Sequence, residues 1–150
     1  MQIRHFQNSD LESLYQIDQA CFPSGISYSL GELSRFISRR GARTWIAAEN
    51  EKIVGFVVVG TTPGHAGHIV TIDVVKEARC SGVGKALMNA VECWARKESL
   101  QLLSLETAED NRTAHAFYSK LGYVKVDEIP GYYSNGTAAW VMVKQLEGPP

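Results

Sequence analysis

The chain has 150 residues, with 15 lysine and arginine against 16 aspartate and glutamate, and a formal net charge of −1 at pH 7. This balance excludes the one-signed field typical of proteins that bind nucleic acid or a membrane surface. The apolar run IVGFVVVG, residues 53–60, is far shorter than the roughly 20 residues of a membrane helix. The amino terminus, MQIRHFQNSD, lacks the apolar core of a signal peptide. The three cysteines, Cys21, Cys80 and Cys93, have no metal-ligand spacing, which is typical of free thiols, so we expect a cytoplasmic protein without a metal.

The length predicts one domain, over residues 1–146, with a C-terminal tail over residues 147–150. Alternating and β-branched patterns predict strands at 1–6, 43–49, 52–60, 68–75, 100–106, 123–129 and 137–146. Apolar residues at helical spacing predict helices at 8–22, 29–40, 82–97 and 110–122. This order predicts the α/β class, with a mixed sheet, flanking helices and a central strand–helix–strand unit.

A glycine-rich turn, ARCSGVGKAL over residues 78–87, joins a strand to the long helix. Free backbone N–H groups and the helix dipole make a helix start a natural anion site. Arg79 and Ala86 exclude a Walker loop, which needs Gly and Ser or Thr at these places. Leu87 excludes a dinucleotide fingerprint, which needs Gly or Ala there. A plain turn without a ligand remains an alternative for the glycines alone.

The remaining pattern, R-x-x-G-x-G, is formed by Arg79, Gly82 and Gly84. Together with N-x-x-A-x-x-F-Y-x-x-L-G-Y downstream, over residues 111–123, it resembles the GNAT superfamily of acetyl-CoA-dependent N-acetyltransferases. The resemblance covers nearly the whole chain, and its closest likeness is to the bacterial ribosomal-protein alanine N-acetyltransferases. It implies a GNAT-type mixed, mostly antiparallel central sheet with splayed central strands, flanked by helices.

The resemblance also implies that acetyl-CoA is the cosubstrate. Its pantetheine arm would enter the gap between the splayed strands and pair with the backbone of Ile72, Asp73 and Val74, with Asn111 nearby. The residues expected around the pyrophosphate are those of the turn: Arg79, Cys80, Ser81, Gly82, Val83, Gly84 and Lys85. The family often has a basic residue where this chain has Cys80 and Ser81. Arg79 and Lys85 as solvated charges, and Asn111 as a helix cap, remain the alternatives.

Acetyl transfer requires that the amine lose a proton, and an α-amino group has a pKa of about 7.7–8.0, so a modest general base suffices. In the family subgroup a Glu and a Tyr at these spacings act as base and acid, which implies these roles for Glu106 and Tyr118. The alternatives are a strand-end charge for Glu106 and helix packing for Tyr118. His65 and His68 are alternative bases, but we expect them to be loop residues.

The segments CFPSGISYSLGEL and PGYYSNG lie where the family forms the two walls of its acceptor groove. Phe22, Tyr28, Tyr132 and Tyr133 would line a slot for a peptide, or would only anchor loops. The acidic residues that the subgroup has after this hairpin glycine are absent. The expected function is acetylation of a protein or peptide N-terminal amine by direct attack. A small amine or lysine side chain as acceptor, and a non-catalytic CoA-binding module, are the alternatives, and the oligomeric state is not predicted.

Overall fold

The computed structural model describes residues 1–146, so the predicted tail at 147–150 lies outside the described residues. One seven-stranded sheet runs through the molecule in the order β1-β2-β3-β4-β5-β7-β6. The strands are β1 (Gln2–His5), β2 (Arg43–Glu49), β3 (Lys52–Thr62), β4 (Ala66–Val74), β5 (Leu102–Ala108), β6 (Val124–Ile129) and β7 (Ala139–Gln145). The helices are α1 (Leu11–Cys21), α2 (Leu30–Ser38), α3 (Val83–Lys97) and α4 (Arg112–Lys120), with short 3-10 turns at Asn8–Asp10 and Lys76–Ala78. The fold class predicted from the sequence is confirmed.

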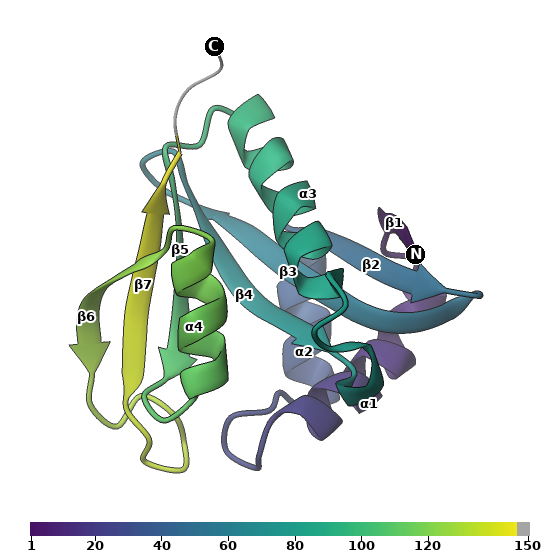
Figure 1. The fold of residues 1–150 in the computed structure, drawn as a ribbon, viewed down its shortest axis with the longest axis horizontal. Helices are drawn as coiled ribbons and strands as arrows, with labels where there is room; N and C mark the ends of the chain where they lie inside the picture. Colours follow the sequence, from purple (N-terminus) through teal and green to yellow (C-terminus); the bar gives the residue numbers. More distant parts are fainter. Residues whose placement is uncertain (147–150) are drawn as a thin grey trace.

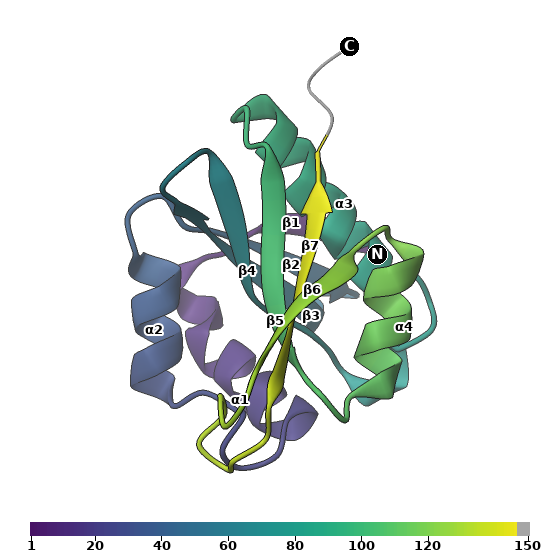
Figure 2. The same ribbon diagram turned by 90° about the vertical axis from the view of Figure 1, so that its left-hand side faces the viewer.

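Two helical layers cover the sheet, α1 and α2 on one face and α3 and α4 on the other (Figures 1 and 2). Strand side chains alternate between the two faces, so the chain builds two apolar clusters. The larger lies under α3 and α4 and includes Leu87, Leu103 and Leu105. The smaller lies under α1 and α2 and includes Leu14 and Phe56.

The sheet opens at its centre, between β4 and β5 (Figure 1). These neighbouring strands are parallel and pair at only three positions, ending with His68 opposite Ser104. Beyond that point β4 continues to Val74 along β3, and β5 continues to Ala108 along β7. The second half of β4 therefore has a partner on one edge alone, as the splayed-strand prediction requires.

The boundaries differ from the predicted ones by a few residues at most, and the predicted first helix begins with a 3-10 turn. That turn is closed by a capping box in which the Asp10 carboxylate accepts from the Gln7 N–H at 2.8 Å. Ser29 caps α2, accepting from the Glu32 N–H at 3.1 Å, as expected for a serine before an apolar run. None of the helices within residues 1–146 is long and apolar enough to cross a membrane.

Candidate active site

Glu106 lies on β5 beside the opening in the sheet. Because Leu103 and Leu105 face α3 and α4, strand alternation turns Glu106 to the opposite face. There its Oε1 lies 2.9 Å from Nε2 of His68 and accepts a 2.9 Å hydrogen bond from the hydroxyl of Tyr132. The carboxylate thus joins β4, β5 and the β6–β7 loop at one point.

The expectation that His68 is a loop residue was wrong. It lies within β4, one pair from the start of the opening, whereas His65 is in the β3–β4 turn with a φ of 60°. The predicted strand already began at His68, but a single sequence does not show that β5 would bring Glu106 to it. The sequence signal that could have indicated a site role for His68 is its position at the end of a predicted strand, beside the predicted gap.

The environment of Glu106 keeps its carboxylate ionised. Burial by itself raises the pKa of Glu106, but the hydrogen bond and charge of His68 and the hydrogen bond from Tyr132 outweigh burial and lower it. The same contact acts in reverse on Tyr132, whose pKa is raised to about 12 by burial and by the adjacent carboxylate. At neutral pH the cluster therefore contains a carboxylate held by a protonated phenol and an imidazole.

Tyr118 approaches the opening from the other face of the sheet. It is carried by α4, is 7% exposed, and belongs to the apolar cluster under α3 and α4. Burial raises the pKa of its hydroxyl well above the usual value, and the nearby Asp73 and Tyr133 add to the shift. The phenol is therefore protonated at any physiological pH, so it is a potential proton donor.

The free edge of β4 presents main-chain groups to the opening. The Val75 N–H donates to the Val54 carbonyl on β3 at 2.9 Å. Because main-chain groups alternate in direction along a strand, the N–H and C=O of Asp73 also point to β3. The main-chain N–H and C=O groups of Ile72 and Val74 consequently point away from β3. Of the three residues predicted to pair with pantetheine, these two have main-chain groups on the open side, while Asp73 does not.

The glycine turn leads from this strand into α3. Gly82 precedes the helix with a φ of 89°, a left-handed conformation that glycine adopts without strain. Gly84 lies in the first helical turn, where a Cβ would come within 3.0 Å of the Phe117 ring. Gly84 thus lets α3 and α4 approach closely, a packing role that the sequence analysis did not assign to it.

The other turn residues differ in their exposure and contacts. Cys80, Ser81 and Lys85 are exposed, whereas Val83 is buried in the core under α3. Ser81 donates to the Ala78 carbonyl at 2.5 Å and tightens the turn.

Arg79 and Asn111, both expected near the cofactor, have local partners in the structure. Arg79 points back along β4, where its Nε donates to the Val74 carbonyl at 3.0 Å. Asn111 caps α4, accepting from the Ala114 N–H at 3.1 Å, which is the helix-cap alternative of the sequence analysis. Neither contact requires a ligand.

Three of the four predicted groove residues converge on Glu106. Burial raises the pKa of Tyr28, and the proximity of Tyr132, Tyr133 and Glu106 contributes to this shift. The rings of Tyr132 and Tyr133 meet edge to face with centroids 4.9 Å apart. Phe22 directly follows α1, half-buried, at the start of the loop that carries Tyr28.

The two loops that would form the walls of the groove touch each other. The Ser134 hydroxyl donates to the Gly25 carbonyl at 3.0 Å. A Cβ on Gly25, whose φ is 91°, would lie 2.7 Å from the Asn135 Cβ. Glycine is therefore required here both by the backbone conformation and by the close approach of the β6–β7 loop.

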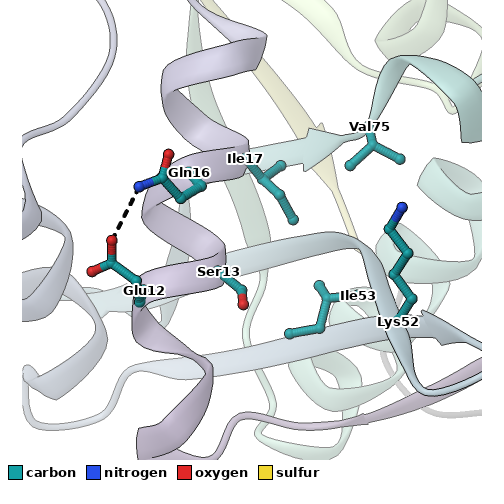
Figure 3. A pocket seen from close by; sticks show the side chains of 7 residues that line it. All are labelled: Glu12, Ser13, Gln16, Ile17, Lys52, Ile53 and Val75. Carbon is teal, nitrogen blue, oxygen red and sulfur yellow. Dashed lines mark hydrogen bonds between the residues drawn. The ribbon is translucent and has the colours of Figure 1, made fainter.

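A separate surface pocket of about 300 Å³ lies between α1, the β2–β3 turn and the end of β4. Figure 3 shows the side chains of Ile17, Ile53 and Val75 beside the Lys52 ammonium, with Glu12 hydrogen-bonded to Gln16 on the helix. None of the predicted site residues lines it. Within residues 1–146, no group of three or more His, Cys, Asp or Glu side chains is arranged to hold a metal ion.

The sheet is parted between β4 and β5, with the start of α3 at one end of the opening and the Glu106–His68 pair at the other. Residues 11–123 match the model of the acetyltransferase (GNAT) family, and the chain belongs to that family. It is an acetyl-CoA-dependent N-acetyltransferase.

Similar proteins match between 71% and 99% of this chain. It is 30% identical over 146 residues to the uncharacterized N-acetyltransferase MJ1530 of Methanocaldococcus jannaschii, covering 97% of this chain and 92% of the relative. It is 30% identical over 118 residues to N-alpha-acetyltransferase 30 of Schizosaccharomyces pombe, covering 71% of this chain and 77% of the relative. The ribosomal-protein-S18-alanine N-acetyltransferase of Escherichia coli shares its fold, with a TM-score of 0.86, 21% identity, and coverage of 99% and 96% of the two chains.

Proposed function

We propose that this enzyme acetylates the α-amino group at the N-terminus of a protein or peptide, with Glu106 and His68 as the base and Tyr118 as the acid. The observation that carries the proposal is the cluster in which Glu106 contacts both His68 and Tyr132 at 2.9 Å. A carboxylate at this point would accept a proton where the predicted peptide groove meets the opening in the sheet. Similarity to N-alpha-acetyltransferases such as that of Schizosaccharomyces pombe supports the acceptor class.

The proton transfers follow from the positions of these side chains. The acceptor amine must lose a proton before or during attack on the acetyl carbon, and an ionised Glu106 takes it directly or through His68. Tyr132 holds the same carboxylate oxygen and fixes its orientation. Tyr118 lies on the other side of the opening and supplies the proton that the departing thiolate needs. The base and the acid thus act from opposite faces of the sheet on the two ends of the transfer.

Acetyl-CoA supplies the activated acetyl group, and the groups that would hold it are those of β4 and the glycine turn. Ile72 and Val74 offer main-chain partners for the amides of pantetheine. The N–H groups at the start of α3, from Gly82 to Lys85, offer donors to the pyrophosphate. The chain fits this ligand, because the open edge of β4 leads to the start of α3 through residues 75–82, which include the 3-10 turn Lys76–Ala78.

The groove residues explain why a peptide end would fit. Phe22 lies at the start of the loop that carries Tyr28. Tyr28 on one wall and Tyr132 and Tyr133 on the other surround the carboxylate with aromatic rings that exclude water. A free α-amine can enter between them, and the hydroxyls can hydrogen-bond the first peptide groups. The Ser134 hydroxyl, which donates to the Gly25 carbonyl at 3.0 Å, ties the two walls together.

The experiment that tests this function is incubation with acetyl-CoA and peptides that carry both a free N-terminus and an internal lysine. Mass spectrometry with fragmentation then locates each acetyl group. The proposal predicts acetylation of α-amines only, and loss of that activity in Glu106→Gln. Acetylated lysines with free N-termini would reject the acceptor class, and cofactor binding without turnover on any amine would favour a non-catalytic module.

A further inference from the structure

Two aspartates, Asp18 on α1 and Asp73 on β4, are buried against each other behind the opening in the sheet. Their exposed fractions are 0% and 1%. Two carboxylates in contact without a cation between them repel strongly in a low-dielectric interior. One of the two must therefore be neutral for the pair to be stable there.

The hydrogen bonds around the pair show where the missing proton belongs. Asp18 uses Oδ2 to accept from the Tyr28 N–H at 2.7 Å, and Asp73 uses Oδ1 to accept from the Thr71 hydroxyl at 2.5 Å. The remaining oxygens, Oδ1 of Asp18 and Oδ2 of Asp73, are buried and have no other partner. The two side chains are within hydrogen-bonding reach of each other, so a proton on Asp73 donated to Asp18 satisfies both orphan oxygens.

The charges around the pair favour the proton on Asp73. Burial raises the pKa of Asp73 far above its usual value, and the hydrogen bond and charge of Asp18 raise it further. Thr71 and the Arg79 guanidinium act in the opposite direction without reversing the shift. The other titratable groups facing the pair are Cys21 on α1, Tyr28 on the α1–α2 loop and Tyr118 on α4, and all three keep their protons because their pKa values are raised.

The pair joins the two halves of the proposed site. Asp73 lies on β4 between Ile72 and Val74, the residues whose main chain faces the opening. Asp18 holds the backbone of Tyr28, and the Tyr28 hydroxyl in turn donates to the Val70 carbonyl on β4 at 3.3 Å. Tyr28 is therefore tied to β4 at both ends, through its N–H by the aspartates and through its hydroxyl directly.

We propose that Asp18 and Asp73 share one proton and act together as a positioning pair, which holds the Tyr28 wall of the peptide groove against the cofactor-facing strand. This inference rests on the proposed function for its effect on peptide binding, while the shared proton and its effect on Tyr28 stand on their own. The pair does not touch the reacting atoms. Its loss should weaken peptide binding more than it slows the chemical step.

The test compares the wild type with Asp73→Asn, which keeps a donor toward Asp18, and with Asp73→Ala, which does not. Infrared difference spectra between the wild type and Asp73→Asn should show the carbonyl band of a protonated carboxylic acid at pH 7. Absence of that band would overturn the proposal.

Peptide kinetics give a second test. Asp73→Ala should raise the KM for peptide at least tenfold, with kcat and acetyl-CoA affinity changed less than threefold. In Asp73→Asn the KM for peptide should stay close to the wild-type value. Equal effects of both variants would also overturn it.

Amide hydrogen exchange at Tyr28 reports on the tie without activity. The protection factor should be high in the wild type and in Asp73→Asn and low in Asp73→Ala. If Asp73→Ala does not fold, an alkaline titration of the wild type decides. As the pH rises, the amide protection of Tyr28 and the infrared band of the protonated acid must then be lost at the same pH. Loss of one without the other contradicts the proposal. If no peptide is acetylated, the proposed function fails, but these two measurements still decide whether the proton is shared.

Discussion

Glu106 and His68 are 38 residues apart in the sequence, yet the carboxylate and the imidazole nitrogen lie 2.9 Å apart across the last paired position of β4 and β5. The β4–β5 pairing ends at His68 and Ser104, where the two strands part. The Glu106 carboxylate, a proton acceptor, therefore lies where the opening begins. Two groups from two other elements, His68 on β4 and Tyr132 on the β6–β7 loop, hold the carboxylate in place.

Glu106→Gln should lower kcat/KM for the peptide by about 10²–10⁴-fold, because an amide does not accept the amine's proton. Glutamine keeps the size of the side chain and an oxygen for Tyr132, so the thermal midpoint should change little. Glu109→Gln, an exposed carboxylate at the end of the same segment, is the matched control. Equal rates in the two variants would remove Glu106 from the mechanism.

Tyr118→Phe should slow transfer by a comparable factor of about 10²–10⁴ if its hydroxyl protonates the leaving thiolate. The diagnostic is an acetyl thioester whose thiol has a lower pKa, since such a leaving group needs no acid and should recover most of the lost rate. Tyr123→Phe is the control, because Tyr123 is also buried and its ring centroid lies 5.8 Å from that of Tyr118. A defect in Tyr118→Phe that is independent of the leaving group would point to packing alone.

Gly82→Ala should destabilise the protein by about 1–2 kcal/mol, because alanine is strained at a positive φ, here 89°. It should also weaken acetyl-CoA binding by disturbing the start of α3. Gly31→Ala is the opposite case, because it lies inside α2 with nothing near its Cβ position and should stabilise by about 0.5–1 kcal/mol. Thermal unfolding and titration calorimetry measure the two effects, and a neutral Gly82→Ala would contradict the assigned turn geometry.

Asp10→Asn should reduce stability at neutral pH by about 1–2 kcal/mol, since it removes the ionised partner of Arg4. The hydrogen bond from Arg4 lowers the pKa of Asp10 despite its burial, so this stabilisation is present above the unfolded pKa of about 3.9 and is lost as pH falls through the folded value. Denaturant unfolding of the variant and the wild type should therefore converge between about pH 4 and pH 2. The exposed Asp110→Asn should show no such convergence, and a pH-independent difference for Asp10→Asn would contradict the ion pair.

Much of this architecture could be predicted from the sequence, because its patterns are local. The alternation in MQIRHF and the helical stripe through Val83, Leu87 and Val91 each act over a few residues, and their elements form as expected. The candidate site, in contrast, is formed by residues that are far apart in the sequence. Pairing of His68 with Glu106 depends on the register of two strands separated by a helix, and nothing near either residue encodes it.

The aspartate pair shows the same limit. The resemblance implies only a backbone contact for Asp73, and the sequence pattern assigns no role to Asp18. Only the packing of α1 on β4 brings them together, with exposed fractions of 0% and 1%. Similarly, the resemblance implies a pyrophosphate-facing role for Gly84, whereas its packing role depends on α4, because a Cβ at Gly84 would come within 3.0 Å of the Phe117 ring.

The most direct test of the account is a crystal structure of the enzyme with coenzyme A and a short peptide bound together. The account predicts pantetheine along the free edge of β4 at Ile72 and Val74, with its sulfur between Glu106 and Tyr118 and the peptide's α-nitrogen facing Glu106. Coenzyme A bound elsewhere, or a peptide N-terminus directed away from Glu106, would contradict it.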